Sequence, residues 1–175
     1  MSDFQVIADR VEIEALRGEF TDAAMMRDYD RLASLFTPDG VLRMPDVPAE
    51  LVGREDIRAW GVRVPALVEY FVQNMHPGTI RLEGDTASGR AYLSELIRLR
   101  DGSSHLNYAI YHDRYQRTVD GWKFTERVYD IRYLDLSPLA GSAPPVAAPP
   151  VAAPLAAAAP ARPPAGNGSA AEGRR

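Results

Sequence analysis

The feature that most constrains the fold is the alternation of apolar and polar side chains over residues 87–99. One set of alternate positions includes Leu93, Glu95 and Ile97, and the other includes Arg98. A period of two over this length predicts a strand with one buried face. Glu95 is the only charge on the apolar face, and a carboxylate in a core must be paired, protonated or turned toward a cavity. We therefore expect the chain to fold around that face.

The first half of the chain has helical periodicity. The spacing of apolar residues predicts a helix from Asp9 to about Arg27, a short second helix that starts at 28–30, and a third over 53–60. Residues 37–40 are typical of a turn, 41–44 of a short strand, and 45–50 of a loop. Because proline fits the first turn of a helix better than its interior, Pro65 predicts a break followed by a further helix to about Phe71. A loop over 73–78 follows.

The second half changes to strands separated by short turns. The predicted strands cover 79–82, 87–99, 105–117 and 122–134, with turns rich in Asp and Gly between them. Helices followed by an antiparallel sheet indicate an α+β fold in which the helices cover one face of a curved sheet. We expect one domain over residues 1–136.

Residues 137–175 differ from the domain in composition. From Pro138 onward the chain is mainly Pro, Ala, Gly and Ser, so this tail cannot bury enough surface to offset its ordering entropy, and we expect it to be disordered. It holds three arginines and one glutamate, so of the chain's net charge of −4 the domain carries about −6. That balance argues against a nucleic-acid partner, which usually requires a basic surface.

Several classes of protein are excluded by what the sequence lacks. There is no cysteine among the 175 residues, so disulfides and thiolate zinc sites are ruled out. We find no secretory signal, no apolar span of about 18 residues, no phosphate-binding glycine loop and no hydrolase elbow. The three histidines lack metal-site spacing. We expect a cytoplasmic protein with no membrane contact and no cofactor.

Three motifs occur in an order that resembles a known superfamily. They are DYDRLASLFTPDG at 28–40, DGWKF at 120–124 and DIRY at 130–133. Together they resemble the nuclear transport factor 2-like superfamily and, within it, the SnoaL-like and scytalone dehydratase group, over residues 7–136. The resemblance implies a cone formed by a curved antiparallel sheet and closed by N-terminal helices around an apolar pocket. Members include dehydratases, isomerases, polyketide cyclases, epoxide hydrolases and non-catalytic binding modules, so the fold alone does not define the reaction.

The resemblance carries over to the site only in part. His76 falls where the dehydratase group has a catalytic histidine, before the first long strand. The group has an aspartate on the first helix with a tyrosine just before it, and these positions are Met25 and Ala24 here. Its second histidine falls on Ile97, its pocket asparagine on Tyr111 and a strand tyrosine on Met44. The complete dehydratase constellation is therefore absent, which implies different chemistry or a pocket that only binds.

The candidate catalytic residues are His76, Glu95 and Tyr111. Imidazole suits general acid–base work, so His76 is the expected acid or base and Glu95 its partner. The alternatives are a structural histidine at a helix end and a glutamate in a buried ion pair or a subunit contact. Tyr111 shares a strand face with Asn107, and both are expected to donate hydrogen bonds to a substrate oxygen. The alternative is packing.

The candidate substrate-binding residues also include positions on the first helix. Thr21 and Met25 lie four apart and share a face, while Asp22 is adjacent and replaces the missing aspartate if the helix is rotated; a solvated Asp22 is the alternative. Met25 and Met44 suit a pocket for a bulky apolar ligand or ordinary core packing. The other two histidines are expected away from the site, because His105 follows a turn and His112 lies on the face opposite Tyr111.

These observations predict a cofactor-independent enzyme that transfers protons, as a dehydratase, isomerase or cyclase, on a small hydrophobic oxygenated metabolite such as a polyketide, terpenoid or steroid. Two alternatives remain open. The first is a non-catalytic module that binds a small molecule, and the second is an oligomerisation subunit whose cone is filled by side chains. A homodimer or homotrimer is expected in every case, because the outer sheet face carries large apolar side chains at Tyr92, Leu96, Tyr108 and Ile110.

Overall fold

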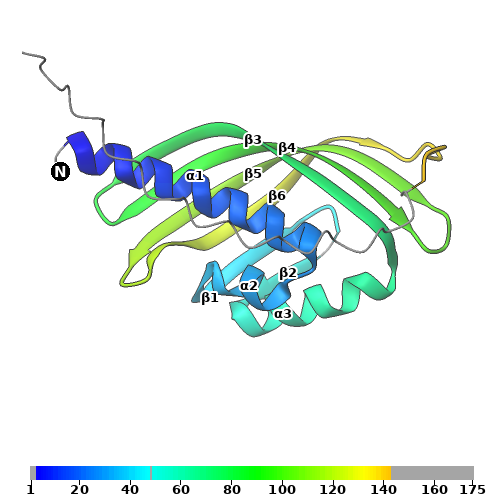
Figure 1. The fold of residues 1–175 in the computed structure, drawn as a ribbon, viewed down its shortest axis with the longest axis horizontal. Coiled ribbons are helices and arrows are strands. Elements are labelled where there is room, and N and C mark those ends of the chain that lie inside the picture. Colours follow the sequence, from blue (N-terminus) through cyan, green and yellow to red (C-terminus); the bar gives the residue numbers. More distant parts are fainter. Residues whose placement is uncertain (1–2, 48, 143–175) are drawn as a thin grey trace, which may run out of the picture. The chain divides into compact units, whose positions relative to one another are not determined.

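The computed structural model describes residues 3–47 and 49–142. Three helices, α1 (Asp3–Met26), α2 (Tyr29–Ser34) and α3 (Gly53–Arg63), are followed by a short 3-10 turn, η1 (Val64–Ala66). The six strands are β1 (Phe36–Met44), β2 (Ala49–Val52), β3 (Val68–Glu83), β4 (Thr86–Leu99), β5 (Ser104–Thr118) and β6 (Gly121–Asp135). The expected α+β class with N-terminal helices and a curved sheet is confirmed (Figure 1).

The six strands form one open sheet in the order β2-β1-β6-β5-β4-β3. The β1–β6 pair is parallel, and the other pairs are antiparallel. The long strands β3 to β6 sweep across the fold, and α1 crosses the sheet on the side where α2 and α3 also lie (Figure 1). The helices therefore cover one face, and no helix of the described residues covers the other face of β3 to β6.

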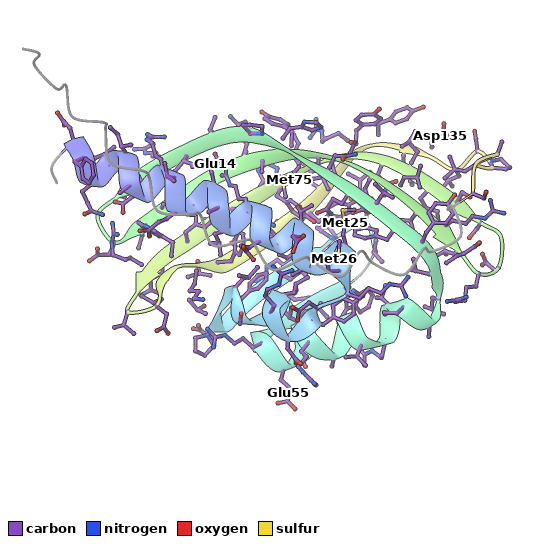
Figure 2. The ribbon with its side chains drawn as sticks, viewed as in Figure 1. Glu14, Met25, Met26, Glu55, Met75 and Asp135 are labelled. Carbon is purple, nitrogen blue, oxygen red and sulfur yellow. The ribbon has the colours of Figure 1, made fainter. Side chains whose placement is uncertain are left out.

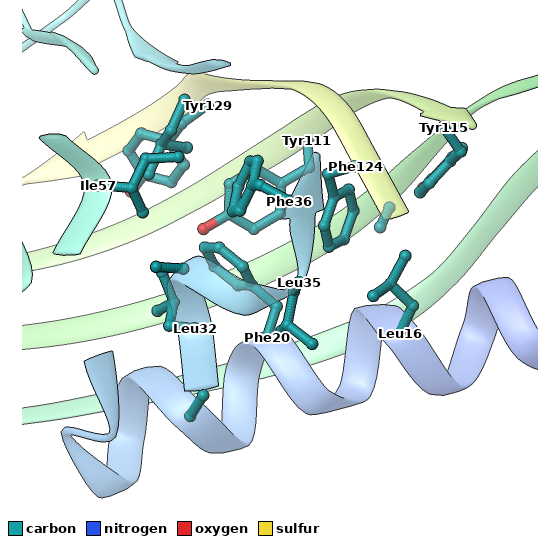
Figure 3. Packing of buried hydrophobic residues seen from close by; sticks show 14 of the residues in the cluster. Leu16, Phe20, Leu32, Leu35, Phe36, Ile57, Tyr111, Tyr115, Phe124 and Tyr129 are labelled. Carbon is teal, nitrogen blue, oxygen red and sulfur yellow. The ribbon is translucent and has the colours of Figure 1, made fainter. Parts of the chain in front are cut away.

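The hydrophobic core lies between α1 and the sheet. Ile13, Leu16 and Phe20 form the buried stripe of α1 at helical spacing. Figure 3 shows Phe20 directed from α1 toward the aromatic rings of the sheet; the centroid of its ring lies 5.7 Å from that of Tyr111 and 6.0 Å from that of Phe124. These edge-to-face contacts fix α1 over the middle of the sheet.

The first helix begins six residues before the predicted start at Asp9. Asp9 is not an N-cap; it is fully buried and accepts hydrogen bonds from Nη2 of Arg117 at 2.6 Å and Nε1 of Trp122 at 3.2 Å. The bond from Arg117 lowers the pKa of Asp9 to about 2. The acidic residue that looked like a helix start is thus a long-range link between α1 and β5–β6.

Two further predictions were wrong because strands replaced irregular segments. Residues 37–40 are part of β1, where the register with β6 shifts between Phe36 and Val41, so the turn-like residues form a bulge. The expected helix from Pro65 to about Phe71 is reduced to the 3-10 turn η1, and its residues from 68 onward belong to β3, as does the expected loop over 73–78. Aromatic and β-branched residues favour a strand when a partner is available, and β4 supplies that partner. The strands β4, β5 and β6 match their predicted positions within a few residues. The strand β2 was not predicted, because its first residues were assigned to the loop over 45–50.

The last strand of the sheet is followed by a short segment that contacts β4. β6 ends at Asp135, and Nη1 of Arg98 donates a hydrogen bond to the carbonyl oxygen of Leu139 at 3.1 Å. The predicted tail over 137–175 lies outside the described residues from residue 143 onward.

Candidate functional site

A cavity of about 350 Å³ lies between the helices and the helix-covered face of the sheet. Its apolar walls come from all three helices and from strands; they include Phe20, Leu32, Ile57, Trp60 and Phe71. Five of its polar groups project from four neighbouring strands, β3 to β6, and are Gln73, Glu95, Asn107, Tyr111 and Tyr129. Arg27, Asp46 and His105 also line the cavity. Small-molecule sites combine a mostly apolar wall with a few polar groups in this way. The cavity argues against the alternative of a cone filled by side chains.

Glu95 is at the centre of the polar groups. Its Oε2 accepts a hydrogen bond from Nε2 of Gln73 at 2.8 Å. Its Oε1 accepts from the hydroxyl of Tyr129 at 3.1 Å and, more weakly, from Nδ2 of Asn107 at 3.5 Å. A carboxylate offers about four lone-pair sites, so these three donors leave acceptor capacity for a ligand.

The pKa of the Glu95 carboxyl is set by its burial, because no cation pairs with it among the described residues. The residue is only 7 % exposed, and no ion pair to it is found within residues 3–47 and 49–142. Burial raises the pKa of the Glu95 carboxyl, and the hydrogen bonds from Gln73, Tyr129 and Asn107 oppose that shift. The side chain therefore holds a proton more readily than an exposed glutamate. The alternative of a buried ion pair with an arginine is not realised at this residue.

Tyr111 and Tyr129 differ in what their hydroxyl groups do. The Tyr129 hydroxyl donates to Glu95, whereas the Tyr111 hydroxyl accepts from Nε2 of Gln73 at 3.2 Å. No described residue accepts the proton of Tyr111 within hydrogen-bond distance, so that proton is free to donate to a ligand oxygen. Burial raises the pKa of both phenols, so both stay protonated donors near neutral pH.

Asn107 has an acceptor without a partner. Its Nδ2 donates to the hydroxyl of Tyr129 at 3.1 Å, while its Oδ1 is buried and has no hydrogen-bond partner among the described residues. A buried carbonyl without a donor costs free energy, which a ligand that donates a hydrogen bond would recover. Asn107 and Tyr111 were both predicted to face the site, and both line the cavity.

The predicted residues of α1 contribute less directly. The hydroxyl of Thr21 donates to Oε1 of Gln73 at 3.0 Å, so Thr21 orients a lining residue without lining the cavity itself. Met25 also lies outside the lining, at the end of α1 beside Met26 (Figure 2). The prediction that Asp22 faces the pocket was wrong, because Asp22 is exposed and pairs with Arg31 on the surface. Met44 does line the cavity.

His76 does not face the cavity, so the predicted pairing with Glu95 was wrong. His76 lies within β3 opposite Tyr92, and it is exposed on the sheet face that no helix covers. Glu95 is instead opposite Gln73, three residues earlier. The register of β3 shifts between His76 and Thr79, where Pro77 makes a bulge, so the segment is an irregular strand and not the end of a helix.

Among the lining residues that the sequence reasoning missed are three polar ones on strands β3, β5 and β6. Gln73 was assigned to a loop, and Tyr129 was not considered. His105 was expected to be exposed, yet it is half-buried and lines the cavity. The alternation along β5 already places His105 on the same face as Asn107 and Tyr111, and this pattern is the signal that could have found it.

A second polar cluster lies on the same face of the sheet, outside the cavity lining. Asp113 and Arg127 form a bidentate pair, with Nε at 2.8 Å and Nη2 at 2.9 Å from the two carboxylate oxygens. Arg17 adds a second cation 3.7 Å from Asp113. The Arg127 guanidinium also stacks on the ring of Tyr111, 4.0 Å from its centroid. Asp113 and Arg127 are both buried, so this ion pair belongs to the core.

The described residues offer no metal site. Within 3–47 and 49–142, no group of three or more His, Asp or Glu side chains could hold a metal ion. No helix of that part of the chain is both long and apolar enough to span a membrane.

The fold is nuclear transport factor 2-like, because N-terminal helices cover one face of a curved sheet. Between the helices and the sheet lies an apolar cavity with several polar groups on its sheet side. A family model described as the SnoaL-like domain matches residues 5–128, and the chain belongs to this family. The predicted relation to the SnoaL-like and scytalone dehydratase-like group is confirmed.

Individual relatives agree with this assignment. An uncharacterised protein of Mycobacterium tuberculosis is 30% identical over 125 residues, which cover 70% of this chain and 84% of the relative. The hexachlorocyclohexane dehydrochlorinase LinA-type3 of Novosphingobium barchaimii is 25% identical, with a TM-score of 0.73 and coverage of 82% of this chain and 100% of that one. A scytalone dehydratase-like protein of Novosphingobium aromaticivorans shares the fold at 18% identity and a TM-score of 0.69, over 82% and 97% of the two chains.

Proposed function

We propose that this protein is a cofactor-independent enzyme that moves a proton on a small hydrophobic, oxygenated molecule, in a dehydration, isomerisation or cyclisation. The observation that carries the proposal is Glu95, a buried carboxyl group that lines an apolar cavity and has no cation partner among the described residues. A carboxylate whose pKa is raised by burial is a stronger base than one in water, and a base works best when its pKa approaches the working pH.

The neighbouring groups suit the transition state of such a reaction. Removal of a proton from the carbon beside a carbonyl places negative charge on the carbonyl oxygen. The hydroxyl of Tyr111 can stabilise that charge by donating a hydrogen bond to the oxygen. The Oδ1 of Asn107, which has no partner among the described residues, can accept a hydrogen bond from a substrate hydroxyl. The apolar walls would hold a hydrocarbon body of one or two rings, as in a polyketide, terpenoid or steroid fragment.

The similarity to dehydrochlorinases is consistent with elimination chemistry in this family. Those enzymes, by their names, remove hydrogen chloride from hexachlorocyclohexane. Elimination and enolisation share their first requirement, a base directed at a carbon-bound proton in an apolar site. We extend that requirement to this chain and assign the base to Glu95.

Deuterium exchange tests the proposal without knowledge of the natural substrate. The probe is 4-phenylbutan-2-one, an enolisable ketone with one ring, incubated with the full chain in deuterated buffer and followed by NMR. We expect the protein to accelerate deuterium uptake beside the carbonyl and Glu95→Gln to lower that rate by a hundredfold or more, in the range of about 10²–10⁴ for general base catalysis. Glu83→Gln, at an exposed carboxylate of β3, is the matched control.

A binding module without turnover is the second candidate. It is favoured by the neighbours of Glu95 on this side, because Glu95 accepts from the amide of Gln73 and Gln73 accepts from the hydroxyl of Thr21. Neither neighbour is an acid–base group. Binding of 4-phenylbutan-2-one with no exchange above the buffer rate would establish this function and overturn the first.

We also propose that the chain forms a homodimer or homotrimer through the uncovered face of the sheet. Tyr92, Tyr108 and Tyr133 are exposed on this face, and the rings of Tyr108 and Tyr133 pack edge to face with centroids 6.1 Å apart. A contiguous apolar patch of this kind on a sheet usually marks an interface. Light scattering coupled to gel filtration gives the state directly, and a monomer at high micromolar concentration would refute the proposal.

A further inference from the structure

We infer that His105 is a second catalytic residue of this cavity, the acid that delivers a proton to the departing oxygen while Glu95 takes one from carbon. The inference rests on the proton-transfer function proposed above and narrows it to elimination of water from a β-hydroxy carbonyl compound.

The position of His105 comes from the register of two strands. Glu95 on β4 is opposite Asn107 on β5, and Ile97 is opposite His105. His105 is thus the diagonal neighbour of Glu95 on one sheet face, a relation that separates the two residues by about 7–8 Å. Ile97, Glu95 and His105 all line the cavity. Two acid–base groups on one wall at this spacing can reach adjacent carbons of a single ligand.

The surroundings of the two groups differ in their access to water. Glu95 is buried, whereas His105 is half-buried near the start of β5. Asp101, in the exposed turn between β4 and β5, has a lowered pKa, chiefly because Ser103 donates hydrogen bonds to it and to a smaller extent because of the nearby charge of His105. The turn thus places the exposed carboxylate of Asp101 near the imidazole of His105, at the solvent side of the cavity wall.

The other histidines do not share this environment. His112 lies on the opposite face of β5, where it pairs with Asp130 at 3.2 Å and is exposed. His76 is on the outer face of β3. Within the described residues, His105 is therefore the histidine that lines the cavity.

The reaction balances with these two groups alone. The Glu95 carboxylate takes the proton from the carbon beside the carbonyl, and the electron pair of that C–H bond forms the new C=C bond. The C–O bond on the next carbon breaks, and the imidazolium of His105 protonates the leaving oxygen to give water. Glu95 then releases its proton and His105 regains one, with solvent as the carrier.

The test uses two probes that differ in one hydroxyl group. The first is 4-phenylbutan-2-one, which can exchange deuterium but has no leaving group. The second is 4-hydroxy-4-phenylbutan-2-one, whose dehydration gives a conjugated ketone that is followed by its ultraviolet absorbance. We expect His105→Gln to lower the dehydration rate by about a hundredfold and to leave the exchange rate within about twofold. His112→Gln, the same substitution on the other face of β5, should change neither rate.

The outcomes separate the two proposals. Exchange by the wild-type protein without dehydration, or dehydration that is unaffected by His105→Gln, would overturn the role of His105 and leave the role of Glu95 intact. Equal loss of both rates in His105→Gln would show that His105 supports the cavity and is not the acid. Absence of exchange and of dehydration in the wild-type protein would overturn the proposed function and, with it, this inference.

Discussion

Glu95 and Asp113 are two buried carboxyl groups on the helix-covered face of one sheet, 7 % and 2 % exposed. Asp113 on β5 receives a bidentate guanidinium from Arg127 and lies near the second cation of Arg17. Glu95 on β4 receives only neutral donors, an amide, a phenol and a second, weaker amide. Asp113 also accepts a hydrogen bond from the hydroxyl of Tyr115, whereas Glu95 lines the cavity between the helices and the sheet.

The difference teaches how a fold separates stability from chemistry. A carboxylate that is paired with two buried guanidinium groups cannot lose these partners without a large loss of stability. A carboxyl group held by neutral donors in a low-dielectric site can gain and lose a proton while its position stays fixed. The first arrangement suits a core, and the second suits a base. Tyr111 joins the two regions, because its ring contacts Arg127 and its hydroxyl contacts Gln73.

The largest expected effect is at the ion pair. Asp113→Asn leaves the buried guanidinium of Arg127 without its counter-charge, so we expect the free energy of unfolding to fall by about 3–5 kcal/mol in urea denaturation. Asp130→Asn, at the partly exposed partner of His112, should cost less than about 1 kcal/mol. Similar small losses in both variants would show that burial does not distinguish these pairs.

The next effect is on rate. Tyr111→Phe removes the one hydroxyl proton of the cavity floor that is free to donate, while the ring stays on Arg127. If Tyr111 stabilises an enolate, kcat for deuterium exchange should fall by about 10²–10³, the usual loss for one oxyanion donor. Tyr129→Phe, whose hydroxyl donates to Glu95 instead, is the comparison. An unchanged kcat in Tyr111→Phe would limit this residue to packing.

A smaller effect is expected on the pH dependence of stability. Folding raises the pKa of Glu95, so its contribution is fully favourable below the ordinary value of 4.5 and is lost as pH rises through the folded pKa. Glu95→Gln, which mimics the protonated acid, should therefore become more stable than the wild-type protein over that rise. Unfolding midpoints in urea across the acid-to-neutral range give the difference. If Glu95→Gln were instead less stable than the wild-type protein over this range, the hydrogen-bond donors around Glu95 would lower its pKa by more than burial raises it.

The smallest effect is expected at His76. Because its side chain lies outside the cavity, His76→Ala should leave the exchange rate of 4-phenylbutan-2-one within about twofold. A hundredfold loss would restore the role that the family resemblance assigned to this residue and would remove the contrast between the two sheet faces.

The part of the site on regular strands could be predicted from the sequence. Alternation along β4 and β5 placed Glu95, Asn107 and Tyr111 on the buried face, because a side-chain period of two needs no knowledge of tertiary structure. The same rule applied to His105, but its position after a turn suggested exposure. Burial depends on what the helices cover, and the sequence pattern of one strand does not contain that information.

The part of the site on β3 could not be predicted in this way. The proline at 65 and the His-Pro-Gly run at 76–78 indicated a helix and a loop, whereas pairing with β4 made a single strand interrupted by a bulge. A shift of one residue in a strand exchanges its two faces. The register therefore decided that Gln73 faces Glu95 and that His76 faces outward, and only the pairing reveals that register.

The central claim is that Glu95 titrates as an uncompensated buried acid. It is tested most directly by NMR of the side-chain carboxyl carbons in the ¹³C-labelled full chain, with the Glu95 signal assigned by its loss in Glu95→Gln. The account predicts that Glu95 titrates above the ordinary glutamate pKa of 4.5. Titration of Glu95 at or below that value would show a carboxylate stabilised in its charged form, like a residue of an ion pair, and would contradict its assignment as the base.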